Sequence, residues 1–172
     1  HMRDREGGWH AVDWDRETLE RCFREDFSGR FRMMAESYYD EVRRMAERKP
    51  DILGHVDLIA KFNEAGRFFD ETDPAYQAAA LEALHAADPK ETLLEINTGA
   101  MSRGYRSVPY PALFLLKEWR AMGGKIILTA DAHSADAIVY GYAQAAELGR
   151  AAGFARSVLP VLAGREERPL DI

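Results

Sequence analysis

Residues that can bind metals end or follow three apolar runs between residues 51 and 133. His55 follows the first run, Glu95 and Asn97 end the second, and Asp131 and His133 follow the third. In βα proteins, functional side chains gather just past the carboxyl ends of the strands. Imidazole and carboxylate groups together suit zinc, manganese or iron. The sequence therefore predicts a divalent-metal site with His55, Asp131 and His133 as its candidate ligands.

Each of these residues also has a structural alternative. Asp131 could cap a following helix and His133 could be an ordinary loop residue. His55 could be a hydrogen-bonded histidine of the core. The coincidence of three strand ends in the same register weakens the cap-and-loop explanation for Asp131 and His133, whereas both explanations stay open for His55.

The elements that must position these residues can be predicted from periodicity. Strands are expected to start near residues 51, 93, 125 and 156, at intervals of roughly 30 to 40 residues, close to the length of a βαβ unit. Apolar residues at helical spacing predict helices over the following ranges: 19–27, 31–45, 74–87, 111–122 and 142–152. This alternation predicts an α/β protein with a parallel sheet or barrel.

Composition limits the partners. The chain has 172 residues and a net charge of −6, which suits one soluble domain and argues against nucleic acid or an anionic membrane as its partner. The single cysteine, Cys22, excludes an internal disulfide and fits a reducing cytoplasm. Cys22 is expected in the core, and His10 is expected as an exposed loop histidine. His1-Met2 resembles a cloning remnant at the start of a single domain over 1–172.

An ordered set of short motifs resembles one family. These are Gly54-His55-Val56-Asp57-Leu58-Ile59, Leu94-Glu95-Ile96-Asn97-Thr98-Gly99-Ala100, Arg103-Gly104-Tyr105-Arg106, Pro109-Tyr110-Pro111 and Asp131-Ala132-His133-Ser134. In this order they resemble the C-terminal part of the histidinol-phosphatases of the PHP superfamily. The resemblance implies a partial, distorted βα barrel with about four C-terminal βα units and with its N-terminal strands missing.

The resemblance also implies site residues. His55, Asp131 and His133 match ligands of the family's metal cluster, which would hold Zn, Mn or Fe. Arg103 and Arg106 are candidates for binding the substrate phosphate, with Lys61 a weaker one, because a guanidinium fork matches phosphate oxygens in charge and geometry. Glu95 and Asn97 either organise the loops by hydrogen bonds or contact metal or substrate.

The implied reaction is the hydrolysis of histidinol phosphate, a small phosphorylated metabolite, to histidinol in histidine biosynthesis. The sequence contains no His-x-His pair, with which the family begins. The chain is therefore expected to be an inactive C-terminal fragment, and the strands it lacks would leave an open sheet edge that favours a homo-oligomer. Two alternatives remain, another PHP phosphoesterase and a non-catalytic assembly or binding fragment.

Overall fold

The structure is a computed structural model that describes residues 1–4, 6–162 and 164–171. The chain divides into two compact units. Unit 1 comprises residues 1–48 and 57–87, and unit 2 comprises residues 49–56 and 88–172. The organisation of residues 1–172 as a single domain stays a prediction.

Unit 1 is mainly helical. A short antiparallel pair, β1 (Met2–Arg3) and β2 (Trp9–His10), precedes α1 (Arg16–Glu25) and α2 (Phe31–Ala46). Two 3₁₀ turns, Leu58–Ala60 and Glu64–Gly66, then lead to α3 (Pro74–His85). The three helices confirm the helical periodicity of this half of the sequence.

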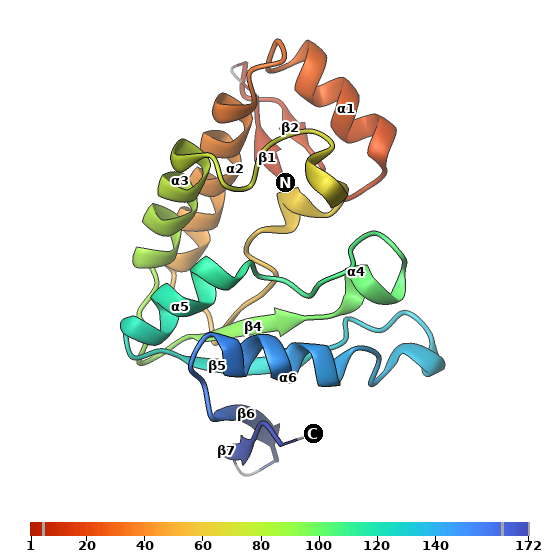
Figure 1. The fold of residues 1–172 in the computed structure, drawn as a ribbon. Helices are drawn as coiled ribbons and strands as arrows, with labels where there is room; N and C mark the ends of the chain where they lie inside the picture. Colours follow the sequence, from red (N-terminus) through yellow and green to blue (C-terminus); the bar gives the residue numbers. More distant parts are fainter. Residues whose placement is uncertain (5, 163, 172) are drawn as a thin grey trace. The chain divides into compact units, whose positions relative to one another are not determined.

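The core of unit 1 lies where α2 packs beside α3 (Figure 1). Asp73 begins α3 as its N-cap and accepts hydrogen bonds from the backbone N–H groups of Ala75 and Tyr76. Phe31 of α2 stacks on Phe69 with ring centroids 4.0 Å apart. The buried Tyr39 hydroxyl donates to the Tyr76 hydroxyl at 2.9 Å, which joins the two helices by a polar contact inside an aromatic core.

Unit 2 is built on a parallel sheet. Its strands are β3 (Ile52–Leu53), β4 (Leu93–Asn97) and β5 (Lys125–Thr129), in the order β3-β4-β5. All five residues of β4 are buried, as expected for the central strand of a covered parallel sheet. The predicted strands near 51, 93 and 125 and their parallel pairing are confirmed.

Helices connect these strands and follow the last of them (Figure 1). α4 (Gly99–Ser102) and α5 (Leu113–Ala121) lie between β4 and β5 in the chain. A 3₁₀ turn, Ala135–Ala137, and α6 (Tyr142–Ala151) follow β5. α5 and α6 confirm the helices predicted over 111–122 and 142–152.

The strand predicted near residue 156 is present, but its assignment to a fourth parallel βα unit is wrong. β6 (Arg156–Val161) pairs in antiparallel fashion with β7 (Gly164–Pro169) and forms a separate two-stranded sheet. β7 follows β6 closely in the chain, so the loop that joins them closes at a small entropic cost, and β6 pairs with β7. In the part of the chain that the structure describes, the parallel sheet has three strands and does not close into a barrel.

Among the described residues, no helix combines the length and the apolar character that crossing a membrane would require.

Candidate functional site

Three of the predicted site residues lie at the same end of the parallel sheet of unit 2. His55 lies two residues beyond β3, Asn97 is the last residue of β4, and Asp131 lies two residues beyond β5. The three strands are parallel and in register, so their carboxyl ends meet at one edge. The structure thus places these residues where the strand-end argument predicts a site.

Glu95 joins the loop after β3 to the end of β5. Its Oε2 accepts a hydrogen bond from the backbone N–H of His55 at 2.7 Å, and its Oε1 accepts one from Thr129 Oγ1 at 2.6 Å. The side chain is nearly buried, with 9% of the residue exposed. Gly54 permits this approach, because a Cβ at that position would lie 3.0 Å from Glu95 Oε2. Glu95 therefore fixes the backbone from which the His55 side chain extends.

The backbone is strained at two of the predicted ligands. His55 has φ of +26° and Asp131 has φ of +45°, both in the region that side chains other than glycine rarely occupy. Such strain persists only where surrounding contacts hold it, and it is concentrated at functional sites. Here the Glu95 hydrogen bond holds the backbone of His55, and Arg103 holds that of Asp131.

Arg103 binds Asp131 through two hydrogen bonds. Its Nη1 donates to the backbone carbonyl oxygen of Asp131 at 3.0 Å, and its Nη2 donates to the Oδ2 of the same residue at 2.9 Å. Gly99 makes room for this pair, since a Cβ there would lie 2.8 Å from Asp131 Oδ2 and 2.9 Å from Arg103 Nη2. The guanidinium predicted to bind phosphate thus lies at the strand end, paired with a predicted metal ligand.

Asn97 and Thr98 hold together the loops around the site. Asn97 Oδ1 accepts from the backbone N–H of Gly99 at 2.8 Å, and the backbone of Asn97 forms a two-bond bridge with Tyr110. Thr98 Oγ1 donates to the Tyr140 carbonyl oxygen at 2.6 Å. These contacts agree with the loop-organising alternative for Asn97.

The donor types at this site suit a divalent metal, but the structure brings them together only in part. His133 Nε2 lies 3.6 Å from Asp131 Oδ1, and the His133 side chain is 72% exposed. Among the described residues, His55, Asp131 and His133 do not form a group whose ligand atoms all lie within 4.8 Å of one another. A common ion would therefore require these three side chains to move closer together.

The other two predicted phosphate-binding residues differ in their placement. Arg106 lies in unit 2 after α4, and its backbone N–H donates to the Ala100 carbonyl oxygen at 3.3 Å. Lys61 belongs to unit 1 and is buried, with Nζ donating to the Asp13 carbonyl oxygen at 2.6 Å. This contact is internal to unit 1, and the part of Lys61 in substrate binding stays a prediction.

Two residues near Glu95 are not among those predicted from the sequence. One is Thr129, whose hydroxyl binds the carboxylate of Glu95. The other is Tyr142, the first residue of α6, whose pKa is raised by burial and also by the negative charge of Glu95. The pairing of the parallel strands points to Thr129. Glu95 pairs with Ile127, and Thr129 lies two residues further along β5, so its side chain is on the same face of the sheet as that of Ile127.

The prediction that His10 is an exposed loop histidine is wrong. This residue ends β2 and its side chain is only 22% exposed, with Nε2 lying 2.7 Å from Asp4 Oδ2 and Nδ1 lying 3.3 Å from Asp26 Oδ2. Together with Cys22 and Asp26 it forms the one group of potential metal ligands found among the described residues. The expected burial of Cys22 is confirmed.

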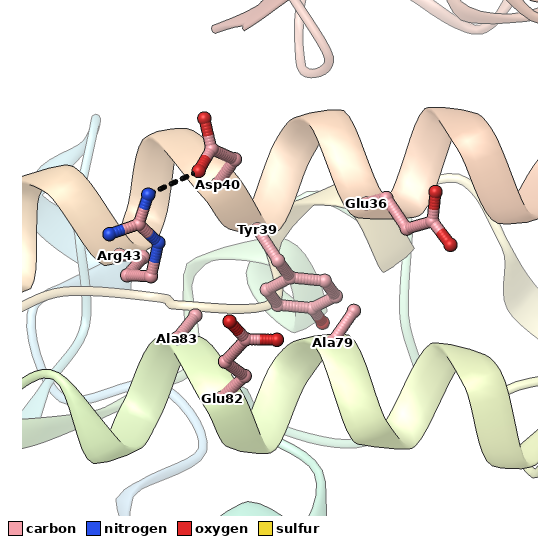
Figure 2. A pocket seen from close by; sticks show the side chains of 7 residues that line it. All are labelled: Glu36, Tyr39, Asp40, Arg43, Ala79, Glu82 and Ala83. Carbon is pink, nitrogen blue, oxygen red and sulfur yellow. Dashed lines mark hydrogen bonds and ion pairs between the residues drawn. The ribbon is translucent and has the colours of Figure 1, made fainter.

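A separate pocket lies between α2 and α3 of unit 1, and Figure 2 shows the residues that line it. The Tyr39 ring reaches from α2 toward α3, and Asp40 is paired with Arg43 at 2.6 Å. None of the predicted site residues lines this pocket, and its charged groups lie on the surfaces of two packed helices. It therefore adds nothing to the predicted chemistry.

Comparison with known proteins supports the fold. No protein-family model and no curated protein matches the chain. Among solved structures, the chain is similar to the crystal structure of a candidate histidinol phosphatase, hisK, from Listeria monocytogenes, with a TM-score of 0.66 and 19% sequence identity. The match covers 83% of this chain and 54% of that one, so the chain spans about half the length of the structure that it matches. At this identity the likeness shows a shared fold.

Proposed function

We propose that the strand ends of unit 2 form part of a divalent-metal centre for the hydrolysis of a phosphomonoester, with histidinol phosphate as the substrate. The observation that carries this proposal is the pairing of the Arg103 guanidinium with Asp131 at the sheet end that also holds His55. The fold that the chain shares with hisK supports it.

Arg103 is the residue that we propose to bind the substrate phosphate. Its fork already binds two oxygen atoms of Asp131, at 3.0 and 2.9 Å, and a phosphate dianion offers two oxygen atoms to the same fork. A metal ion that takes the Asp131 carboxylate would release Arg103 for the phosphate. We therefore expect metal and phosphate binding to support each other. We propose Arg106 as a second phosphate contact.

We propose Zn, Mn or Fe as the metal, held by His55, Asp131 and His133 with water in the remaining positions. When bound, such an ion lowers the pKa of a water molecule and neutralises charge on the phosphoryl oxygens. Glu95 would keep His55 in position through its backbone N–H, and Arg103 would orient the phosphate. The sequence contains no His-x-His pair, so the donor set of this chain is smaller than that of the family, and we propose that the chain by itself turns over little substrate.

The direct test is the binding of a phosphate compound. Calorimetric titration of the Mn²⁺-loaded chain with inorganic phosphate and with histidinol phosphate should give binding that is lost when the metal is removed. Arg103→Ala should weaken it by about tenfold or more, because each charge-assisted hydrogen bond contributes about 1.5–3 kcal/mol. Arg168→Ala, which removes an exposed arginine of β7, is the matched control and should have no effect. Equal binding with and without metal would contradict the proposal, and robust turnover would contradict the expected inactivity.

Metal content tests the ligand assignment separately. Elemental analysis after dialysis should show less bound metal in His133→Ala than in the wild type, because the loss of one of three protein ligands weakens a site strongly. His85→Ala removes an exposed histidine from the end of α3 in unit 1 and should leave the metal content of this site unchanged. Equal metal content in His133→Ala and the wild type would remove His133 from the assignment.

A panel of phosphomonoesters that includes nucleotides separates histidinol phosphate from the substrates of other PHP phosphoesterases.

We also propose that the chain forms a homo-oligomer. In the three-stranded sheet β3 is an edge strand of two residues, and its Ile52 is 40% exposed, so a second chain could pair with or cover this edge.

A further inference from the structure

Four residues bring metal-binding groups together within unit 1. His10 ends β2, Cys22 lies in α1, and Asp26 is the C-cap of that helix. Cys22 and Asp26 are four residues apart, so they share one face of α1. The ligand atoms of His10, Cys22 and Asp26 all lie within 4.8 Å of one another. A single ion could contact all three without a large rearrangement.

The fourth residue, Asp4, orients the His10 ring. Asp4 Oδ1 accepts from the backbone N–H groups of Glu6 and Gly8, both at 2.8 Å, which leaves Oδ2 directed at His10 Nε2 at 2.7 Å. Gly8 is needed for this approach, because a Cβ there would lie 2.4 Å from Asp4 Oδ2. A carboxylate that accepts a hydrogen bond from one ring N–H of a histidine fixes the tautomer and leaves the other nitrogen able to bind a metal. For His10 that other nitrogen is Nδ1.

The groups around His10 Nδ1 are those that a metal needs. Nδ1 lies 3.3 Å from Asp26 Oδ2, so a cation that takes the place of a ring proton between them could bind both atoms. Cys22 is 2% exposed. Its burial is the main reason why the pKa of its thiol is raised to about 12, and its hydrogen bond with Asp26 is the second reason. The side chains of His10 and Asp26 are 22% and 30% exposed, which leaves room for a water molecule on the solvent side.

We propose that His10 Nδ1, Cys22 Sγ and an Asp26 carboxylate oxygen bind one Zn²⁺ ion, with a water molecule as the fourth ligand and with Asp4 orienting His10. Imidazole, thiolate and carboxylate in a four-coordinate site are the ligands that zinc prefers. On binding, the S–H bond of Cys22 breaks, a sulfur–zinc bond forms, and the thiol proton passes to solvent. This site does not depend on the proposed phosphomonoesterase function, since its residues are all in unit 1.

Cobalt is a suitable probe because Cys22 is the single cysteine of the chain. Titration of the metal-free protein with Co²⁺ should produce a near-ultraviolet thiolate-to-cobalt charge-transfer band that saturates at one equivalent and disappears when Zn²⁺ is added. An ion at His55, Asp131 and His133 cannot produce this band, so the two sites are distinguished by the spectrum. The absence of the band at saturating Co²⁺ would overturn the proposal.

Variants test the individual ligands. Cys22→Ser should abolish the band, whereas His10→Gln and Asp26→Asn should weaken Co²⁺ binding by about tenfold or more, and Asp4→Asn by about tenfold through the orientation of His10. His85→Ala is the matched histidine control and should bind Co²⁺ as the wild type does. A band that is equally strong in His10→Gln and Asp26→Asn would show cysteine binding alone and overturn the site. If these variants do not fold, X-ray absorption of the zinc-loaded wild type decides: one sulfur among the zinc ligands is expected, and none would overturn the proposal.

Discussion

Glu95→Ala is expected to destabilise the protein by about 2–3 kcal/mol, because it removes the acceptor of two hydrogen bonds at a nearly buried position. The backbone N–H of His55 and the hydroxyl of Thr129 would both lose their partner. His55 would also lose the contact that holds its strained backbone. We therefore expect the affinity of the strand-end site for Mn²⁺ to fall by about tenfold or more.

Glu95→Gln is the matched control for this prediction. Its amide oxygen can still accept from His55, and its amide nitrogen can donate to the Thr129 hydroxyl, which is able to act as acceptor when it rotates. Urea unfolding followed by circular dichroism should show a cost of about 1 kcal/mol or less for this variant. The role given to Glu95 would be wrong if the alanine and glutamine variants had the same stability and the same affinity for metal.

Gly124→Ala is expected to destabilise the protein by about 3 kcal/mol through overpacking. A Cβ at this position would lie 2.3 Å from two ring atoms of Trp119, Cε2 and Nε1. The indole is fully buried and its Nε1 donates to the Lys125 carbonyl oxygen at 2.9 Å, so the ring cannot move away without breaking this hydrogen bond. Lys125 begins β5, the strand that leads to Asp131, and the damage should therefore extend toward the candidate site.

Gly123→Ala separates this steric effect from backbone strain. Gly123 has φ of +84°, and a Cβ there would have no atom within 4 Å, so its replacement should cost only about 1–2 kcal/mol from the left-handed conformation. Thermal unfolding of the two variants under the same conditions provides the comparison. If Gly124→Ala were no less stable than Gly123→Ala, the contact with Trp119 would not be the reason for glycine at position 124.

Much of the local structure follows from the sequence because its causes are local. The stripes in α1 and α2 and the Asp73-Pro74 start of α3 are set by periodicity and by an N-cap within a few residues. The apolar runs of β4 and β5 predict buried parallel strands, and His55 and Asp131 follow strand ends as predicted, while their role as ligands stays a prediction. β6 differs because an apolar run does not specify its partner. Its hairpin with β7 depends on a strand of charged and exposed residues that carries little strand signal of its own.

The sequence by itself determined the parallel core strands, the helices and the strand ends at which His55 and Asp131 lie. Only the tertiary structure decided which side chains meet. In the structure Arg103 pairs with Asp131, and Glu95 accepts hydrogen bonds from His55 and Thr129. His10 of β2 lies beside Cys22 and Asp26, which belong to a different element. The physical reason is the sequence separation over which each effect acts. Capping and helical or strand periodicity depend on residues that are only a few positions apart in the chain. A contact between side chains far apart in the sequence depends instead on how whole elements pack, and no pattern within either element records it.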